Sequence, residues 1–188
     1  MRLFVALDVP ETVRAALAEL SGRLKKTCPS ARWVRLESVH ITLKFIGEVP
    51  PENLERIRQA LGEVPGFEPI TMRFIGVGFF PSARRPRVFW VGVEASPHLA
   101  ELAAAIEMKL QPLGVPPEKR AFQPHLTLAR FETPQGTQAL SAALEALGKP
   151  EFGRETFREF HLYESVLKRS GAEYTRLATY PLDRETAS

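Results

Sequence analysis

Two short segments of the chain repeat the same pattern of histidine, threonine and aliphatic residues. The segments are HITL at 40–43 and HLTL at 125–128, and they lie 85 residues apart, since 125 minus 40 is 85. In an extended strand successive side chains point to opposite faces, so His40 and Thr42 share one face and the aliphatic residues share the other. His125 and Thr127 are paired in the same way. Each segment is therefore expected to present an imidazole and a hydroxyl roughly 7 Å apart along a strand.

This combination of groups suits in-line chemistry at phosphorus. The nucleophile and the leaving oxygen occupy opposite apices of the reacting phosphorus, so a general base and a general acid are needed on opposite sides. Histidine serves in both roles, because its ordinary pKa of about 6.5 populates both protonation states near neutrality. The hydroxyls of Thr42 and Thr127 can donate hydrogen bonds to a phosphate anion, which a carboxylate would repel.

The offset of 85 also relates the elements that must position the two motifs. Each half of the chain is expected to form strand, helix, strand, helix and strand. In the first half these elements are expected at 2–7, 11–26, 40–43, 53–61 and 71–79, and in the second at 87–92, 96–110, 125–128, 138–146 and 156–164. The motifs fall in matching places in the two halves, which favours duplication over a chance similarity.

The duplication predicts an α+β fold with two lobes related by a pseudo-twofold axis. Each lobe is expected to be a mainly antiparallel sheet with helices on its outside, and a central groove is expected between the lobes. We interpret residues 1–188 as a single bilobal domain, with repeats at about 1–80 and about 87–166 and with 167–188 completing the sheet. The linker is expected at 78–86, where GFFPSARRP contains turn-forming residues.

Other kinds of catalytic site have weaker support in this sequence. The motifs contain no carboxylate or thiolate and lack the i, i+4 histidine spacing of helical zinc sites, so no metal is expected. Cys28 is the one cysteine and lies in a turn-like TCPS segment, and no G-x-S-x-G motif is present. No phosphate-binding loop of the form G-x-x-x-x-G-K-[ST] occurs. We therefore expect neither a metal nor another cofactor.

The sequence resembles the 2H phosphoesterases, a family named for paired His-x-Thr motifs. Within it, the chain is similar to the RNA 2',3'-cyclic phosphodiesterases, also called 2'-5' RNA ligases or LigT-like proteins. The resemblance covers nearly the whole chain, through RLFVALDVP, HITLKFIGEV, PHLTLARF and LYESVLKRSGAEYTRLATYPL. It implies a bilobal fold with two sheets around a groove. It also implies hydrolysis of an RNA 2',3'-cyclic phosphate to a 2'-phosphomonoester, without metal or nucleotide cofactor.

The resemblance assigns roles to the matching residues. His40 would protonate the departing 3' oxygen and His125 would activate water, while Thr42 and Thr127 would hold the phosphate. The family also implies ligation of a cyclic-phosphate end to a 5'-hydroxyl through a 2'-5' bond. Because the motifs are alike, the sequence leaves open which imidazole faces which ribose oxygen.

Arg130 resembles a family arginine near the phosphate. Strict alternation places it on the face opposite His125, unless a bulge or the strand end turns it. Lys44 continues the His40 face, and Arg84, Arg85 and Arg87 are candidates for a basic rim, although solvated surface explains these four equally well.

The remaining histidines and the aromatic residues have mainly structural interpretations. His98 and His161 are expected to be structural or surface residues. A platform for stacking RNA bases is a second interpretation for some of the aromatic residues, most of which are expected in the core. These are Trp33, Phe45, Phe79, Phe80 and Phe122.

Composition adds little to this interpretation. The chain has 188 residues, of which 44% are hydrophobic and 25% charged, as in ordinary globular proteins. Its net charge of +3 is only a mild bias toward RNA. The N-terminus lacks a signal-peptide pattern, so we expect a cytoplasmic protein with no membrane association, acting as a monomer.

Three functions remain open from the sequence. The first is action on RNA with a 2',3'-cyclic phosphate end, with tRNA fragments among the candidate substrates. The second is a small-molecule phosphodiesterase for a cyclic nucleotide or an ADP-ribose cyclic phosphate. The third is a non-catalytic RNA-binding module.

Overall fold

Each half of the chain contains the expected strands and helices in the expected order, and the first half has an additional short strand at 32–33. The computed structural model describes residues 1–183. The first half contains β1 (Arg2–Asp8), α1 (Glu11–Leu24), β2 (Arg32–Trp33), β3 (His40–Glu48), α2 (Leu54–Gly62) and β4 (Ile70–Phe80). The second half contains β5 (Val88–Ala95), α3 (His98–Leu110), β6 (His125–Arg130), α4 (Thr137–Glu145), β7 (Glu151–Phe157), β8 (Glu159–Lys168) and β9 (Gly171–Pro181). Both motifs begin a strand, as predicted.

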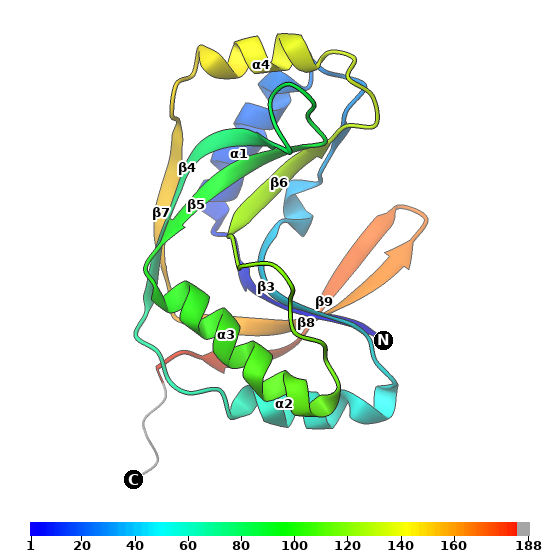
Figure 1. The fold of residues 1–188 in the computed structure, drawn as a ribbon, viewed down its shortest axis with the longest axis vertical. Helices are drawn as coiled ribbons and strands as arrows, with labels where there is room; N and C mark the ends of the chain where they lie inside the picture. The colour runs from blue at the N-terminus through cyan, green and yellow to red at the C-terminus, as the bar shows by residue number, and fades with distance from the viewer. Residues whose placement is uncertain (184–188) are drawn as a thin grey trace.

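The strands form two antiparallel sheets, each of which takes strands from both halves of the chain (Figure 1). The first sheet has the order β3-β1-β8-β9, and the second has the order β2-β6-β5-β4-β7. β8, from the second half, pairs with β1, and β4, from the first half, pairs with β5. The two sheets with their helices confirm the predicted α+β class. The exchange of the third strand between the halves is not visible in the repeat pattern.

One predicted strand is divided in the structure. Residues 156–164 were expected to form a single strand, but the strand breaks at Arg158. β7 ends before this residue and pairs with β4 in the second sheet, whereas β8 begins after it and pairs with β1 in the first. The chain therefore passes from one sheet to the other at Arg158. The connection between the halves is also shorter than 78–86, because β4 continues to Phe80.

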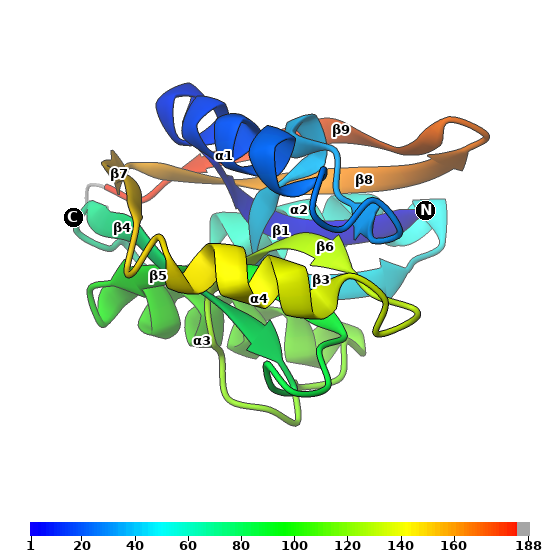
Figure 2. The ribbon, with the colours of Figure 1, turned by 90° about the horizontal axis from the view of Figure 1, so that it is seen from above.

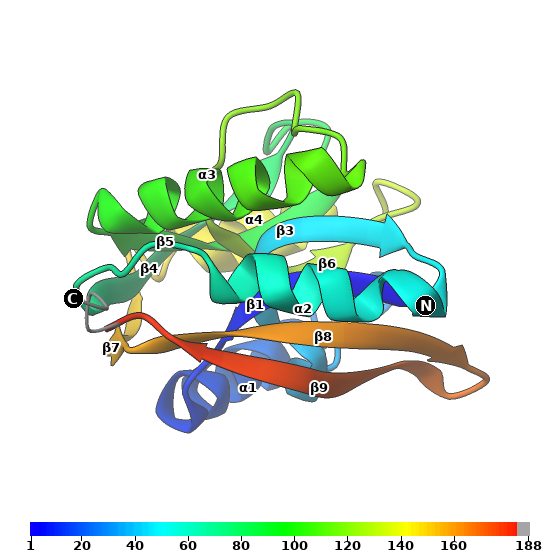
Figure 3. The same ribbon diagram turned by 90° about the horizontal axis from the view of Figure 1, so that it is seen from below.

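The helices gather at two ends of the molecule. α2 and α3 contact each other at one end, while α1 and α4 lie at the other (Figures 1 and 2). Figure 3 shows α3 and α2 beside β3. Leu3, Val5 and Leu7, which alternate along β1, are buried, because one face of this strand lies in the core. No helix within residues 1–183 combines the length and the apolar character needed to cross a bilayer.

A β-bulge in β3 corrects the predicted orientation of two residues. Val5 pairs with Lys44 and Ala6 with Thr42, so Leu43 has no partner of its own and the alternation shifts. Phe45 consequently lies on the His40 face and is 64% exposed, although strict alternation from His40 would place it on the opposite face. Lys44 turns away from that face.

Lys44 is therefore not part of a basic rim. It is buried, and its Nζ donates to Glu107 Oε1 at 3.0 Å and to the carbonyl of Pro116 at 2.7 Å. A further ion pair with Glu118 spans 3.4 Å. These contacts join β3 to α3 and to the segment between α3 and β6.

Candidate active site

His40 is held at the first residue of β3 by contacts behind its ring. Its Nδ1 donates to the carbonyl of Ser38 at 3.1 Å, which leaves Nε2 as the reactive nitrogen of the neutral ring. Arg14 of α1 fixes the η1 turn (Leu36–Ser38) by donating to the carbonyls of Leu36 and Val39. The His40 side chain is only 8% exposed. Its orientation is thus set before any ligand binds.

His125 has the same support in the second half. Its Nδ1 donates to the carbonyl of Gln123 at 2.9 Å, again two residues before the histidine. Nε2 is the remaining nitrogen here too. The residue is exposed, in contrast to His40, whose side chain is largely buried.

A second bulge decides where Arg130 lies. Phe89 pairs with Ala129 and Trp90 with Thr127, so Leu128 is the additional residue, just as Leu43 is in β3. Because Arg130 is opposite Val88, it lies on the face that carries Thr127. The bulge that the sequence left open therefore turns Arg130 toward the His125 face. Arg130 is exposed there.

The two motif strands lie beside each other: β3 is the edge strand of the first sheet, and β6 lies next to the short edge strand β2 in the second. β3 contacts β6, and Figures 1 and 3 show them side by side in the middle of the molecule. β2 pairs with β6, and Val34 donates to the carbonyl of Leu128 at 2.9 Å. The chain then reaches His40 through the η1 turn. The fold thus brings together the two strands that carry the His-Thr pairs.

A pocket of about 670 Å³ opens beside His40. Tyr163, Tyr174 and Arg176 form part of its lining. Among the described residues, neither Thr42 nor His125 contributes to it. The pocket therefore extends the site on the His40 side alone.

A carboxylate with several partners faces His40. Asp8, the last residue of β1, is opposite His40 in the sheet, and its Oδ1 lies 3.7 Å from His40 Nε2. Its other oxygen lies 3.6 Å from Nε2 of His161. The Tyr163 hydroxyl and the Arg176 guanidinium both donate to Asp8. Four side chains from three strands thus surround one carboxylate.

Burial controls the protonation of this cluster. It lowers the pKa of His40 below 6.5, while the Ser38 carbonyl and the Asp8 charge oppose this effect. Burial likewise lowers the pKa of His161. The pKa of Tyr163 is raised to about 12 by burial and by its hydrogen bond to Asp8. Tyr163 therefore remains a protonated donor at neutral pH.

His125 packs beside aromatic side chains. The Phe80 ring packs edge-on at 5.6 Å, and Phe80 packs against Trp90 at 5.4 Å. Phe80 is 39% exposed, so part of its ring is accessible beside the histidine. The other aromatic candidates differ: Trp33, Phe79 and Phe122 pack against the core, and Phe45 is exposed on the His40 side.

The sequence assigned no role to Asp8, Tyr163 or Arg176. The sequence did contain an indication for Asp8, because alternation places its carboxylate on the same face of the strand as Phe4 and Ala6, while the opposite face is apolar. Tyr163 and Arg176 had no such signal, because their relation to Asp8 depends on the pairing of β8 with β1 and β9.

The other histidines and arginines differ in their exposure to solvent. His161, expected to be structural or on the surface, is 2% exposed and contacts Asp8. His98 is on the surface, where its Nδ1 lies 2.9 Å from Glu101. Arg84, Arg85 and Arg87 are all exposed in or beside the connection between β4 and β5. Within residues 1–183, no group of three or more His, Cys, Asp and Glu side chains is arranged to ligate a metal ion.

Comparison with known proteins assigns the chain to a family. The family model described as "LigT like Phosphoesterase" matches residues 7–90 and, a second time, residues 91–174. The chain belongs to the LigT-like phosphoesterases. The double match confirms the duplication predicted from the offset of the two motifs.

LigT-like relatives match along nearly the full chain. An RNA 2',3'-cyclic phosphodiesterase of Archaeoglobus fulgidus is 37% identical, over 96% of this chain and 99% of that protein. One of Thermus thermophilus is 35% identical, over 98% of this chain and 92% of the relative.

Solved structures agree with this LigT-like fold. TT0787 of Thermus thermophilus has a TM-score of 0.79 at 31% identity, over 97% of this chain and 98% of that one. LigT of E. coli complexed with phosphate has a TM-score of 0.71 at 27% identity, with the same coverage.

Proposed function

We propose that the protein opens 2',3'-cyclic phosphates at RNA ends and releases 2'-phosphomonoesters. The observation that carries this proposal is the pair of His-x-Thr strands lying side by side, in which each imidazole donates through Nδ1 to a backbone carbonyl two residues earlier. Two such groups provide the acid and the base that in-line displacement at phosphorus requires. The names of the LigT-like relatives support the same substrate class.

In the proposed reaction, His125 removes a proton from water as the water oxygen forms a bond to phosphorus. The bond from phosphorus to the 3' oxygen breaks, and His40 donates its proton to that oxygen. The 2' oxygen keeps the phosphate. Thr42, Thr127 and Arg130 donate to the non-bridging oxygens, where negative charge accumulates. A 5'-hydroxyl in place of water would give 2'-5' ligation in the same site.

The decisive experiment uses RNA ending in a 2',3'-cyclic phosphate, with EDTA present and ATP omitted. The expected product is the 2'-phosphate, identified by mass and by comparison with 2'- and 3'-phosphate standards. His40→Ala and His125→Ala should each reduce the rate by at least about 10²-fold. His98→Ala is the matched control, because that histidine lies on the surface, and it should retain full activity.

Several outcomes would overturn the proposal. Loss of activity on addition of EDTA would show a metal-dependent reaction, and a 3'-phosphate product would reverse the leaving-group assignment. Much faster turnover of a mononucleotide than of an oligomer with the same end would favour the small-molecule phosphodiesterase. Salt-dependent binding without turnover would favour the RNA-binding module. Cytoplasmic location, a monomeric state and tRNA fragments as substrates stay predictions from the sequence.

A further inference from the structure

The two halves of the site match in position but not in charge. Asp8 is opposite His40 in the first sheet, whereas Gly92 is opposite His125 in the second. Asp8 therefore presents a carboxylate to His40, whereas Gly92, in the equivalent place beside His125, has only a hydrogen atom as its side chain.

The next strand shows the same contrast. His161 is opposite Ala6 in the first sheet, and Gly78 is opposite Trp90 in the second. Gly78, and not Gly76 as the offset of 85 suggests, therefore occupies the place of His161. A Cβ on Gly78 would lie 2.2 Å from the Trp90 ring. The bulky side chain of this pair therefore belongs to β5 in the second sheet, whereas in the first sheet it is His161 of β8.

The aromatic neighbours of the two histidines also match. Tyr163 follows His161 by two residues and packs against His40 at 4.7 Å, while Phe80 follows Gly78 by two and packs against His125 at 5.6 Å. Only Tyr163 carries a hydroxyl, and that hydroxyl donates to Asp8. The polar network is thus confined to the His40 half.

We infer that Asp8 is a positioning residue that favours the proton-carrying form of His40, which is the form that the acid of the proposed reaction requires. This inference rests on the proposed function. Tyr163 and Arg176 hold the carboxylate toward Nε2 of His40, where a proton on that nitrogen gains from the opposite charge 3.7 Å away.

Asp8 is one of two groups that oppose the effect of burial on this ring. Burial lowers the pKa of His40, and so do the charges of Arg14 and His161, whereas the hydrogen bond to the Ser38 carbonyl and the charge of Asp8 raise it. The titratable and charged side chains around this ring and its pocket come from five elements and from the residue that precedes one of them. They are Asp8 of β1, Arg14 of α1, Arg35 beside η1, Glu37 of η1, His161 and Tyr163 of β8, and Glu173, Tyr174 and Arg176 of β9.

The test compares the pH dependence of kcat/KM for wild type and Asp8→Asn on a 2',3'-cyclic nucleotide, between about pH 5 and about pH 9. Without the carboxylate, His40 loses its proton at lower pH. The ratio of the wild-type rate to the variant rate should therefore approach one at the acidic end and rise to about tenfold at neutral and alkaline pH.

Glu159→Gln is the matched control. It neutralises a carboxylate 3.6 Å from His161 Nε2 that belongs to the same cluster but does not face His40. The ratio of the wild-type rate to the Glu159→Gln rate should not change with pH. If Asp8→Asn does not fold, Asp8→Ser removes the same charge, and titration of the His40 ring proton by NMR reads its pKa directly in either variant.

The outcomes separate this inference from the proposed function. A rate loss in Asp8→Asn that is equal at every pH would show a purely structural role and overturn the inference, while His40→Ala and His125→Ala still lacked activity. A variant faster than wild type at acidic pH would make His40 the base and also overturn it. Absence of turnover by the wild-type protein would instead defeat the proposed function itself.

Discussion

Thr71 of β4 and Thr156 of β7 are paired on neighbouring strands of the second sheet, with their Oγ1 atoms 3.1 Å apart. They are separated by 85 residues, which is also the separation of the two motifs. The residues on either side pair symmetrically, Ile70 with Phe157 and Met72 with Glu155. The local twofold axis therefore passes between these threonines. His40 and His125 are separated by the same 85 residues.

Arg130 offers a direct test of phosphate binding. Arg130→Ala should lower kcat/KM by about 10²-fold, because a charged donor to the non-bridging oxygens is lost. Arg130→Lys should recover only part of the activity, since lysine keeps the charge but not the planar pair of donors. Arg84→Ala is the control, as it removes an exposed arginine of the connecting segment. An equal loss in Arg84→Ala would indicate general attraction of RNA.

Phe80 is expected to bind a base next to His125. Phe80→Ala should raise KM for a 2',3'-cyclic nucleotide by about tenfold with little change in kcat, because stacking on one aromatic ring is lost. Phe45→Ala removes another exposed ring, on the His40 side, and should leave KM unchanged. A larger effect at Phe45 than at Phe80 would place the base on the other side of the site.

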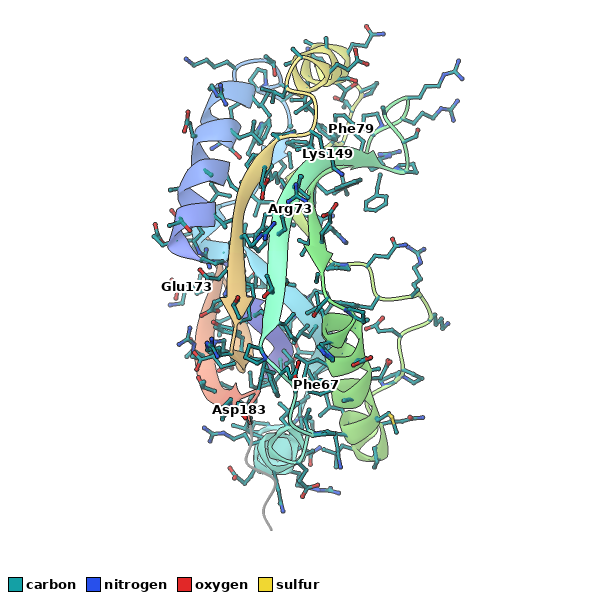
Figure 4. All side chains as sticks on the ribbon, turned by 90° about the vertical axis from the view of Figure 1, so that its left-hand side faces the viewer. Phe67, Arg73, Phe79, Lys149, Glu173 and Asp183 are labelled. Carbon is teal, nitrogen blue, oxygen red and sulfur yellow. The ribbon has the colours of Figure 1, made fainter. Side chains whose placement is uncertain are left out.

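Lys44 is expected to contribute to stability instead of RNA binding. Lys44→Met should lower the free energy of unfolding by roughly 2 kcal/mol, because charged hydrogen bonds to Glu107 and Pro116 are lost. Urea unfolding measures this change. Lys149→Met is the control, since Lys149 is exposed beside Arg73 on the open side of β4 and β7 (Figure 4). Its free energy should change by less than about 0.5 kcal/mol.

The buried histidines predict weaker folding in acid. Burial lowers the pKa of His40 and His161 in the folded protein, so the unfolded chain binds more protons below about pH 6.5. The stability present above that pH is lost as the pH falls through the folded-state pKa values. Tm should therefore fall between about pH 7.5 and about pH 5, and less steeply in His161→Gln. An unchanged slope in this variant would contradict the prediction for His161.

The sequence by itself determined the two motifs, the duplication and the class of chemistry. These features depend on local patterns: alternation places His40 with Thr42 and His125 with Thr127, and a constant offset relates the halves. The order of helices and strands follows from the same short-range periodicity.

Tertiary structure alone decided the rest. Bulges reverse alternation without any mark in the sequence, so the directions of Lys44 and Arg130 depended on how their strands pair. Asp8 meets Tyr163 and Arg176 only because β8 crosses into the sheet of β1 and brings β9 with it. The pKa of His40 likewise depends on burial, which is a property of packing. The repeat makes the two histidines alike, and the strands packed beside them make them different.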